Sequence, residues 1–248
     1  MRCDRLSTIN YMEHKLNELA LFAGAGGGIM GGQRLGWKTV CAVEIDKYAR
    51  DILFSRQFSG QLPKFPVWDD VRTFDGRPWQ GKICIITGGF PCQDISCAGN
   101  RKGIDGEKSG LWKEYARIIS EIRPCFVFVE NSPDIAFRGL GTILGDISEM
   151  GYNARWGVFS SADVGACHIR ERMWILAYSK CIRPGRVRKW EEMEKAERQG
   201  EIKAHGGLAA IVRNYDVLAN KLDRKRCVGN GQDPRVVELA WRCLFGRN

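Results

Sequence analysis

The sequence predicts an α/β protein built on a doubly wound, mostly parallel β-sheet. Short, nearly continuous apolar runs recur along the chain, and such runs are typical of strands that are buried on both faces. Stretches of helical periodicity separate these runs, as in a sheet covered by helices on both sides. With 248 residues, the chain is long enough for one large domain with a small appendage.

The expected elements follow in chain order. Apolar runs of strand length occupy residues 19–23, 39–45, 83–87, 126–129 and 174–177, and a further strand is expected at 154–159. Helical periodicity covers residues 47–57, 110–122 and 140–150. Near the C-terminus, Pro234 suits the first turn of a final helix with one apolar face.

The alternating pattern ends at about residue 178 and a basic segment follows. From Lys180 to Arg226 there are thirteen Lys and Arg against seven Asp and Glu, which accounts for most of the net charge of +9. Such a segment indicates either a polyanionic partner, first of all nucleic acid, or a solvated basic face. We therefore expect one sheet domain, from residues 1–177 and 227–248, and a small irregular second domain at 178–226.

Composition argues against several classes of protein. No window approaches the roughly eighteen apolar residues of a membrane span, and the N-terminal stretch lacks the apolar core of a signal peptide. The ten cysteines then indicate free thiols in a reducing compartment, so a cytoplasmic protein is expected. Because the sequence has no CxxC pair and only three histidines, no metal site is predicted, and thiols such as Cys84 and Cys125 are expected to be small buried hydrophobes.

Three features at successive strand ends predict a nucleoside-bearing cofactor. The stretch FAGAGGG follows the first strand, and its glycines would let a ligand approach the backbone, although they could also serve a tight turn alone. Glu44 ends the second strand about twenty residues later, where a carboxylate can accept both hydroxyls of a ribose. Asp69 and Asp70 follow a third, short strand at the same edge. The glycine spacing does not match a dinucleotide fingerprint, and no phosphate-binding lysine follows.

One cysteine has an unusual setting. The stretch GGFPCQDIS follows the apolar run KICIIT, so that Cys92 lies on a loop leaving a buried strand, directly after Pro91. A proline stiffens this step, and a rigidly held, exposed thiol is suited to nucleophilic chemistry.

These segments resemble a known family. FAGAGGG, VEIDKYA, GGFPCQDIS, FVFVENSP, IRERMWILA and GNGQDPRVVELAW occur in the order of the motifs of the DNA (cytosine-5)-methyltransferases, over residues 19–177 and 222–245. The resemblance implies a Rossmann-like methyltransferase sheet, S-adenosylmethionine as the cofactor without a metal, and DNA as the partner. It also implies that residues 178–226 are an unusually short target-recognition segment, and that the last motif folds back beside the first. A cognate restriction endonuclease and a monomeric state are further expectations.

The resemblance assigns chemical roles to four residues. Cys92 would add to carbon 6 of a flipped-out cytosine, which makes carbon 5 nucleophilic. Glu130 would hydrogen-bond or protonate ring nitrogen 3, and Arg170 and Arg172 would bind the base carbonyl and a phosphate. His168 occupies the position of the family's glutamine, and its role stays open.

The remaining residues that the resemblance implies contact the cofactor. They are Phe22, Gly24, Gly26, Gly27, Glu44, Ile45, Asp70, Val71, Pro91, Leu111, Asn230 and Gly231. Two alternatives to a DNA methyltransferase stay open: a nucleic-acid-binding protein with little activity on a methyltransferase scaffold, and an RNA cytosine-5 methyltransferase.

Overall fold

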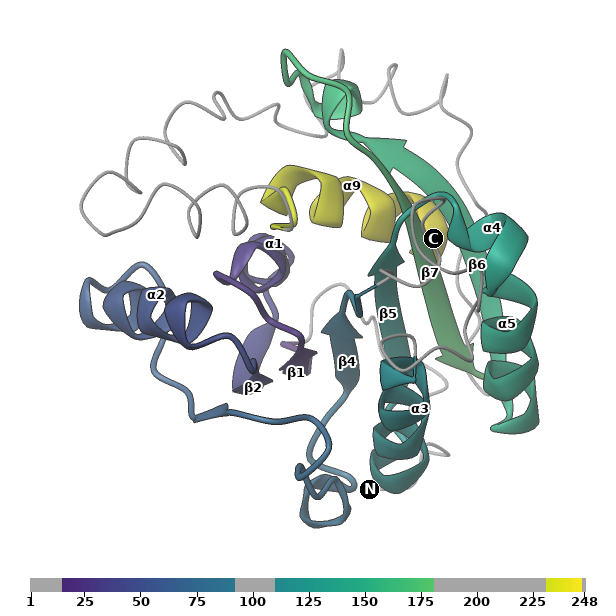
Figure 1. Cartoon of the computed structure of the whole chain (residues 1–248), viewed down its shortest axis with the longest axis horizontal. Coiled ribbons are helices and arrows are strands. Elements are labelled where there is room, and N and C mark those ends of the chain that lie inside the picture. Colours follow the sequence, from purple (N-terminus) through teal and green to yellow (C-terminus); the bar gives the residue numbers. More distant parts are fainter. Residues whose placement is uncertain (1–14, 92–109, 181–230, 247–248) are drawn as a thin grey trace.

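A seven-stranded sheet forms the centre of the protein (Figure 1). The computed structural model describes residues 15–91, 110–180 and 231–246. Within them the strand order is β3-β2-β1-β4-β5-β7-β6. The strands are β1 (Asn17–Leu21), β2 (Lys38–Val43), β3 (Val67–Trp68), β4 (Ile85–Gly88), β5 (Phe126–Asn131), β6 (Tyr152–Ser160) and β7 (Glu171–Ser179).

The sheet is parallel from β3 to β5 and antiparallel at β7 and β6, so the predicted mostly parallel, doubly wound sheet is confirmed. From β1 the chain first winds outward through β2 and β3, and then returns to place β4 on the other side of β1. Only residues 161–170 connect β6 to β7, which is too short for a crossover connection, so these two strands pair antiparallel.

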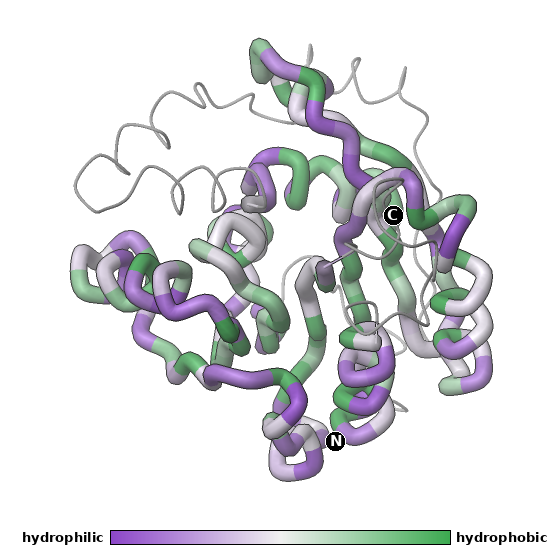
Figure 2. The backbone as a smooth tube through the Cα atoms, in the orientation of Figure 1, coloured by the Kyte–Doolittle hydropathy of each residue, from purple (hydrophilic) through white to green (hydrophobic). Residues whose placement is uncertain are grey.

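Helices cover both faces of the sheet (Figure 1). Helices α3 and α5 pack on one face, whereas α1, α2 and α9 pack on the other, and the short α4 follows β5. Hydropathy follows this arrangement, because the central strands are mostly hydrophobic and the helices are mixed (Figure 2). The bounds are α1 (Gly27–Arg34), α2 (Lys47–Phe58), α3 (Leu111–Ile122), α4 (Ile135–Arg138), α5 (Leu140–Glu149) and α9 (Pro234–Phe245).

Each helix and strand predicted within the described residues is present, but several strand ends differ. The strands β5 and β7 are longer than their apolar runs, because Glu130 pairs with Trp174 and Asn131 with Met173 in the antiparallel ladder. Hydrophobic periodicity detects only the apolar part of such strands. The segment 178–226, expected to be a small second domain, lies largely outside the described residues.

The C-terminal helix closes the core beside the first helix. Trp241 of α9 packs edge-on against Trp37, with ring centroids 4.8 Å apart, and against Phe128 at 5.5 Å. A Cβ at Gly31 of α1 would lie within 3 Å of the Val237 side chain, so the two helices touch at a glycine. The C-terminal helix is thus held beside the first helix, although the two are far apart in the sequence. Cys84 and Cys125, expected to be buried, are only half-buried and pack against this core.

A carboxylic acid lies at the centre of the sheet. Glu18 of β1 is fully buried and accepts hydrogen bonds from the hydroxyls of Thr39 on β2 (2.6 Å) and Thr87 on β4 (2.7 Å). Burial raises the pKa of Glu18 to about 7, although the two threonine hydroxyls act to lower it. The folded protein therefore holds a proton at pH values where the unfolded chain has lost it.

We expect Glu18→Gln to flatten the pH dependence of stability. As pH rises from the ordinary glutamate pKa of 4.5 through about 7, the folded state binds more protons than the unfolded one, so the wild type loses stability. The loss amounts to about 3 kcal/mol between about pH 5 and pH 8.5. Urea unfolding of both proteins across this range measures it. A difference between wild type and Glu18→Gln that stays constant with pH would contradict the prediction, and exposed Glu149→Gln is the control.

Candidate active site

A cavity of about 400 Å³ lies at the carboxyl ends of the parallel strands. This edge includes the point between β1 and β4 where the winding of the sheet reverses, and ligands of open α/β sheets bind at such a point. The walls come from the ends of β1, β2, β4 and β5, from the loop after β3, and from the first residue of α3. The start of β7 and the segment before α9 complete them.

Glu44 joins the first two strand ends. The backbone N–H of Gly24 donates to its Oε2 at 2.6 Å, and the N–H of Asp46 donates to its Oε1 at 2.8 Å. Arg50 of α2 donates to the carbonyls of Glu44 and Ile45, at 2.9 and 2.7 Å, and so fixes the end of β2. Burial raises the pKa of Glu44. The carboxylate is thereby held in one orientation at the cavity wall.

An apolar wall lies next to this carboxylate. Phe22 follows β1 with a φ of 51°, a left-handed conformation that is uncommon for a non-glycine residue, and it stacks on Tyr115 with centroids 6.2 Å apart. Ile45 lines the cavity although it is 58% exposed, and Val71 and Leu111 line it as well. Apolar side chains that line a cavity beside a fixed carboxylate suit a ligand with a flat ring and a sugar.

Asp70 lines the same cavity from the loop after β3. Its Oδ1 accepts from the backbone N–H of Arg72 at 2.9 Å and from the Arg72 Nε at 3.1 Å. The hydrogen bond from the Arg72 backbone, with the guanidinium beside it, lowers the pKa of Asp70. Asp70 is thus an ionised acceptor at the cavity.

The glycine turn allows two close approaches of the backbone. Gly26 caps α1 with a φ of 89°, and a side chain there would also meet Leu53 at 2.8 Å. A Cβ on Gly27 would overlap the backbone carbonyl of Gln232, in the segment before α9. Neither glycine lines the cavity; both let the turn and the C-terminal segment form its wall.

Glu130 lies at the end of β5 and is only 8% exposed. Arg172 Nε forms an ion pair with its Oε1 at 2.8 Å, and Gln232 Nε2 lies 3.4 Å from its Oε2. Burial raises the pKa of Glu130, whereas Arg172, Arg170 and the Gln232 amide act to lower it. A carboxyl group with a raised pKa at a cavity wall is a candidate general acid.

Arg170 and Asn131 tie the surrounding segments together. Arg170 Nη2 donates to the Gly231 carbonyl at 2.9 Å, which connects the start of β7 to the C-terminal segment. Asn131 Nδ2 donates to the Phe90 carbonyl at 3.3 Å, so the end of β5 holds the backbone just before Pro91. His168 is exposed and does not line the cavity.

The structure brings most of the sequence-predicted site residues into this one cavity. Cys92 and Asn230 lie outside the described residues, but their neighbours Pro91 and Gly231 both line it. The predicted residues at the cavity are Phe22, Gly24, Glu44, Ile45, Asp70, Val71, Pro91, Leu111, Glu130, Arg170, Arg172 and Gly231.

Two residues that support the site, Arg50 and Gln232, are not among those predicted from the sequence. The contacts of Arg50 with the carbonyls of Glu44 and Ile45 are local in the sequence. Arg50 lies six residues after Glu44 and five after Ile45, near the start of the next helix. Gln232 has no such signal, because its contacts with Gly27, Gly28 and Glu130 are all distant in the chain.

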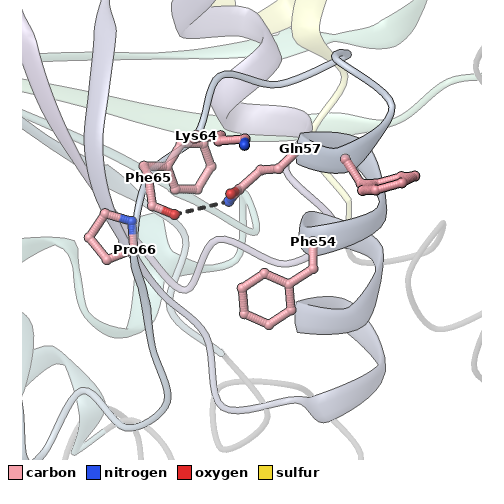
Figure 3. Close-up of a pocket in the computed structure, with 6 residues that line it drawn as sticks. Phe54, Gln57, Lys64, Phe65 and Pro66 are labelled. Carbon is pink, nitrogen blue, oxygen red and sulfur yellow. Dashed lines mark hydrogen bonds between the residues drawn. The ribbon is translucent and has the colours of Figure 1, made fainter.

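A second cavity, of about 470 Å³, lies between α2 and the segment that precedes β3 (Figure 3). Phe54, Gln57 and Phe58 of α2 line it together with Lys64, Phe65 and Pro66. Gln57 Nε2 donates to the Phe65 carbonyl at 3.1 Å (Figure 3). None of the predicted site residues lines this cavity.

Comparison with known proteins agrees with this geometry. Residues 16–233 match the model of the C-5 cytosine-specific DNA methylases. This chain belongs to that family. Among the described residues of this methylase-family chain, no group of three or more His, Cys, Asp or Glu side chains is placed to hold a metal ion, and no helix is long and apolar enough to cross a membrane.

Individual relatives of this methylase-family chain come from viruses and bacteria. The chain is 35% identical over 170 residues to the Type II methyltransferase M.CviJI of Paramecium bursaria Chlorella virus IL3A, covering 68% of this chain and 45% of that protein. It is 34% identical to the Type II methyltransferase M.PspPI of Psychrobacter sp. (strain TA137), covering 60% and 36%. The chain therefore spans less than half the length of these two relatives.

Solved structures agree at the level of the fold. The S. pombe Dnmt2 methyltransferase matches with a TM-score of 0.54 at 19% identity, over 84% of this chain and 57% of that one.

Proposed function

We propose that this chain transfers a methyl group from S-adenosylmethionine to carbon 5 of cytosine in DNA. The observation that carries the proposal is that one cavity is lined both by a ribose-type carboxylate, Glu44, and by a buried acid with two arginines, Glu130, Arg170 and Arg172. A cofactor pocket and a base pocket that open into each other are what a direct transfer between two substrates requires.

The cavity residues fit S-adenosylmethionine. Glu44 offers a fixed acceptor to ribose hydroxyls, Phe22, Ile45, Val71 and Leu111 offer apolar contact to a purine, and the turn at Gly24 exposes backbone to the amino-acid part. When bound, this cofactor supplies an electrophilic methyl group.

The protein's own residues would act on the cytosine. The Cys92 thiolate adds to carbon 6 and forms a C–S bond, while the electron density displaced from the ring moves towards nitrogen 3. Glu130 donates a hydrogen bond or proton to that nitrogen, and Arg170 and Arg172 bind the base carbonyl and a phosphate. Once carbon 5 is methylated, loss of its proton and of the thiolate restores the aromatic ring.

The target carbon cannot be reached inside a stacked duplex. The proposal therefore includes flipping of the cytosine out of the helix, at a cost of a few kcal/mol that phosphate contacts offset. The basic segment 178–226 is the proposed source of these contacts and of sequence recognition. Because relatives are named Type II methyltransferases, the proposed setting is a restriction–modification system with a cognate endonuclease.

Glu44→Gln is expected to weaken S-adenosylmethionine binding about 10- to 100-fold. An amide keeps only one acceptor oxygen, so its NH₂ group would face one of the two backbone N–H donors that hold Glu44. Calorimetric titration of the purified protein with S-adenosylmethionine measures the change. Exposed Asp51→Asn on α2 is the control, and a Glu44→Gln dissociation constant within about twofold of wild type would contradict the assignment.

A transfer assay tests the function itself. Tritiated S-adenosylmethionine is supplied with duplex DNA, single-stranded DNA or tRNA, and label should appear in duplex DNA as 5-methylcytosine. Transfer to tRNA alone would establish the RNA enzyme instead. Absence of transfer to all three would leave a nucleic-acid-binding protein on a methyltransferase scaffold and overturn the proposed activity.

A further inference from the structure

Gln232 occupies a slot between two glycines of the active site. A Cβ on Gly28, in the first turn of α1, would overlap Gln232 Oε1. On the opposite side, a Cβ on Gly89 after β4 would lie 3.3 Å from Gln232 Nε2 and would overlap Glu130 Oε2. A larger residue at Gly28 would therefore displace the amide, and one at Gly89 would displace the Glu130 carboxyl group and crowd the amide.

The amide has a defined direction in this slot. Its oxygen lies against the first turn of α1, where the helix carries partial positive charge, and this favours the oxygen over the NH₂ group there. Its nitrogen consequently points to Glu130 Oε2, at 3.4 Å, while Arg172 Nε holds Oε1 at 2.8 Å. Two donors from different parts of the chain thus hold the two oxygens of one carboxylate.

We propose that Gln232 is a positioning residue for Glu130, which fixes the plane of the carboxyl group towards the reacting base. The inference rests on the proposed function and adds a residue to it. Gln232 acts through Glu130, since it does not line the cavity. Its amide also connects the first turn of α1, at Gly28, to the Glu130 carboxyl group.

The backbone of Gln232 has a separate role, which makes the side chain testable alone. Its carbonyl packs against Gly27, and the preceding Gly231 carbonyl accepts from Arg170 at 2.9 Å. Substituting the side chain leaves these backbone contacts in place. Loss of the amide should therefore change the state of Glu130 and leave the cofactor wall intact.

The charges that face Glu130 set the direction of the effect. Arg172 and Arg170 favour its ionised form. The charge of Asp233 in turn favours the charged form of Arg170. The Gln232 amide also favours the ionised form, against the effect of burial. Removing the amide should therefore raise the pKa of Glu130 further.

The test compares Gln232→Leu with wild type, and with Gln80→Leu at an exposed position as the matched control. The ¹³C signal of the Glu130 carboxyl group, assigned with Glu130→Gln, is followed during a pH titration of the full chain. We expect its midpoint to rise by about half to one unit in Gln232→Leu. The pH-independent kcat should fall about 3- to 10-fold, with the KM for S-adenosylmethionine within about twofold.

Gln232→Glu provides a second measurement if Gln232→Leu does not fold. This variant has the same size and places a second carboxyl group beside Glu130. The pH midpoint of the Glu130 signal should therefore rise by more than about one unit. An unchanged midpoint in the folded variants would overturn the role of Gln232, even if wild type transfers methyl groups. A raised midpoint in a protein without transferase activity would overturn the proposed function and leave the positioning role standing.

Discussion

Glu130→Gln should reduce methyl transfer to duplex DNA by about 100- to 10,000-fold. The amide has nearly the same shape and can still donate a hydrogen bond, but it cannot deliver a proton to ring nitrogen 3. Burial raises the pKa of Glu130, so the wild-type carboxyl group keeps its proton to a higher pH than an ordinary glutamate. The wild-type rate should fall as pH rises through this pKa, and Glu130→Gln should lack that fall.

Single-turnover rates with saturating cofactor and DNA, measured over a range of pH, test both parts. Exposed Glu149→Gln, at the end of α5, is the control and should retain the wild-type rate and profile. Activity of Glu130→Gln within about fivefold of wild type would remove Glu130 from the mechanism. An unchanged fall in rate at high pH would assign that titration to another group.

Much of this fold could be predicted because its strands are buried on both faces. The run at β5, Phe126–Asn131, is buried throughout, and such a strand is visible in sequence as an apolar run. The apolar run does not include the last two residues of this strand, because Glu130 and Asn131 are polar. They belong to the strand through their pairing with β7, which is distant in the sequence. Strand ends that carry site residues are therefore where periodicity is least informative.

The candidate site was predictable to the extent that its residues follow strands in order. Glu44, Asp70 and Glu130 each come at or just after the end of a strand, and parallel strands bring such ends to one edge. Gln232 was not predictable, since its slot exists only because α9 returns beside α1 and places it between Gly28 and Gly89. Contacts between segments two hundred residues apart leave no local pattern.

Cys92→Ser should abolish both methyl transfer and covalent capture of DNA. A serine hydroxyl is far less nucleophilic than a thiolate at neutral pH, so the rate should fall by at least about a thousandfold. DNA carrying 5-fluorocytosine cannot lose its carbon-5 substituent after methylation, so wild type should remain bonded to it. A denaturing gel should show a protein–DNA band for wild type with S-adenosylmethionine, and Cys92→Ser should give none.

The other cysteines decide how this experiment is interpreted. Cys41 and Cys243 are buried, and burial raises the pKa of their thiols to about 11 and about 12, so neither supplies a thiolate at neutral pH. Cys167 is exposed and lies in the connection between β6 and β7. Cys167→Ser is therefore the matched control and should keep the band. A band that survives Cys92→Ser would contradict the assignment and move the nucleophile to another thiol, with Cys97, five residues further along the sequence, tested next. Because Asn131 holds the backbone at Phe90, two residues before Cys92, Asn131→Ala should weaken the band without abolishing it.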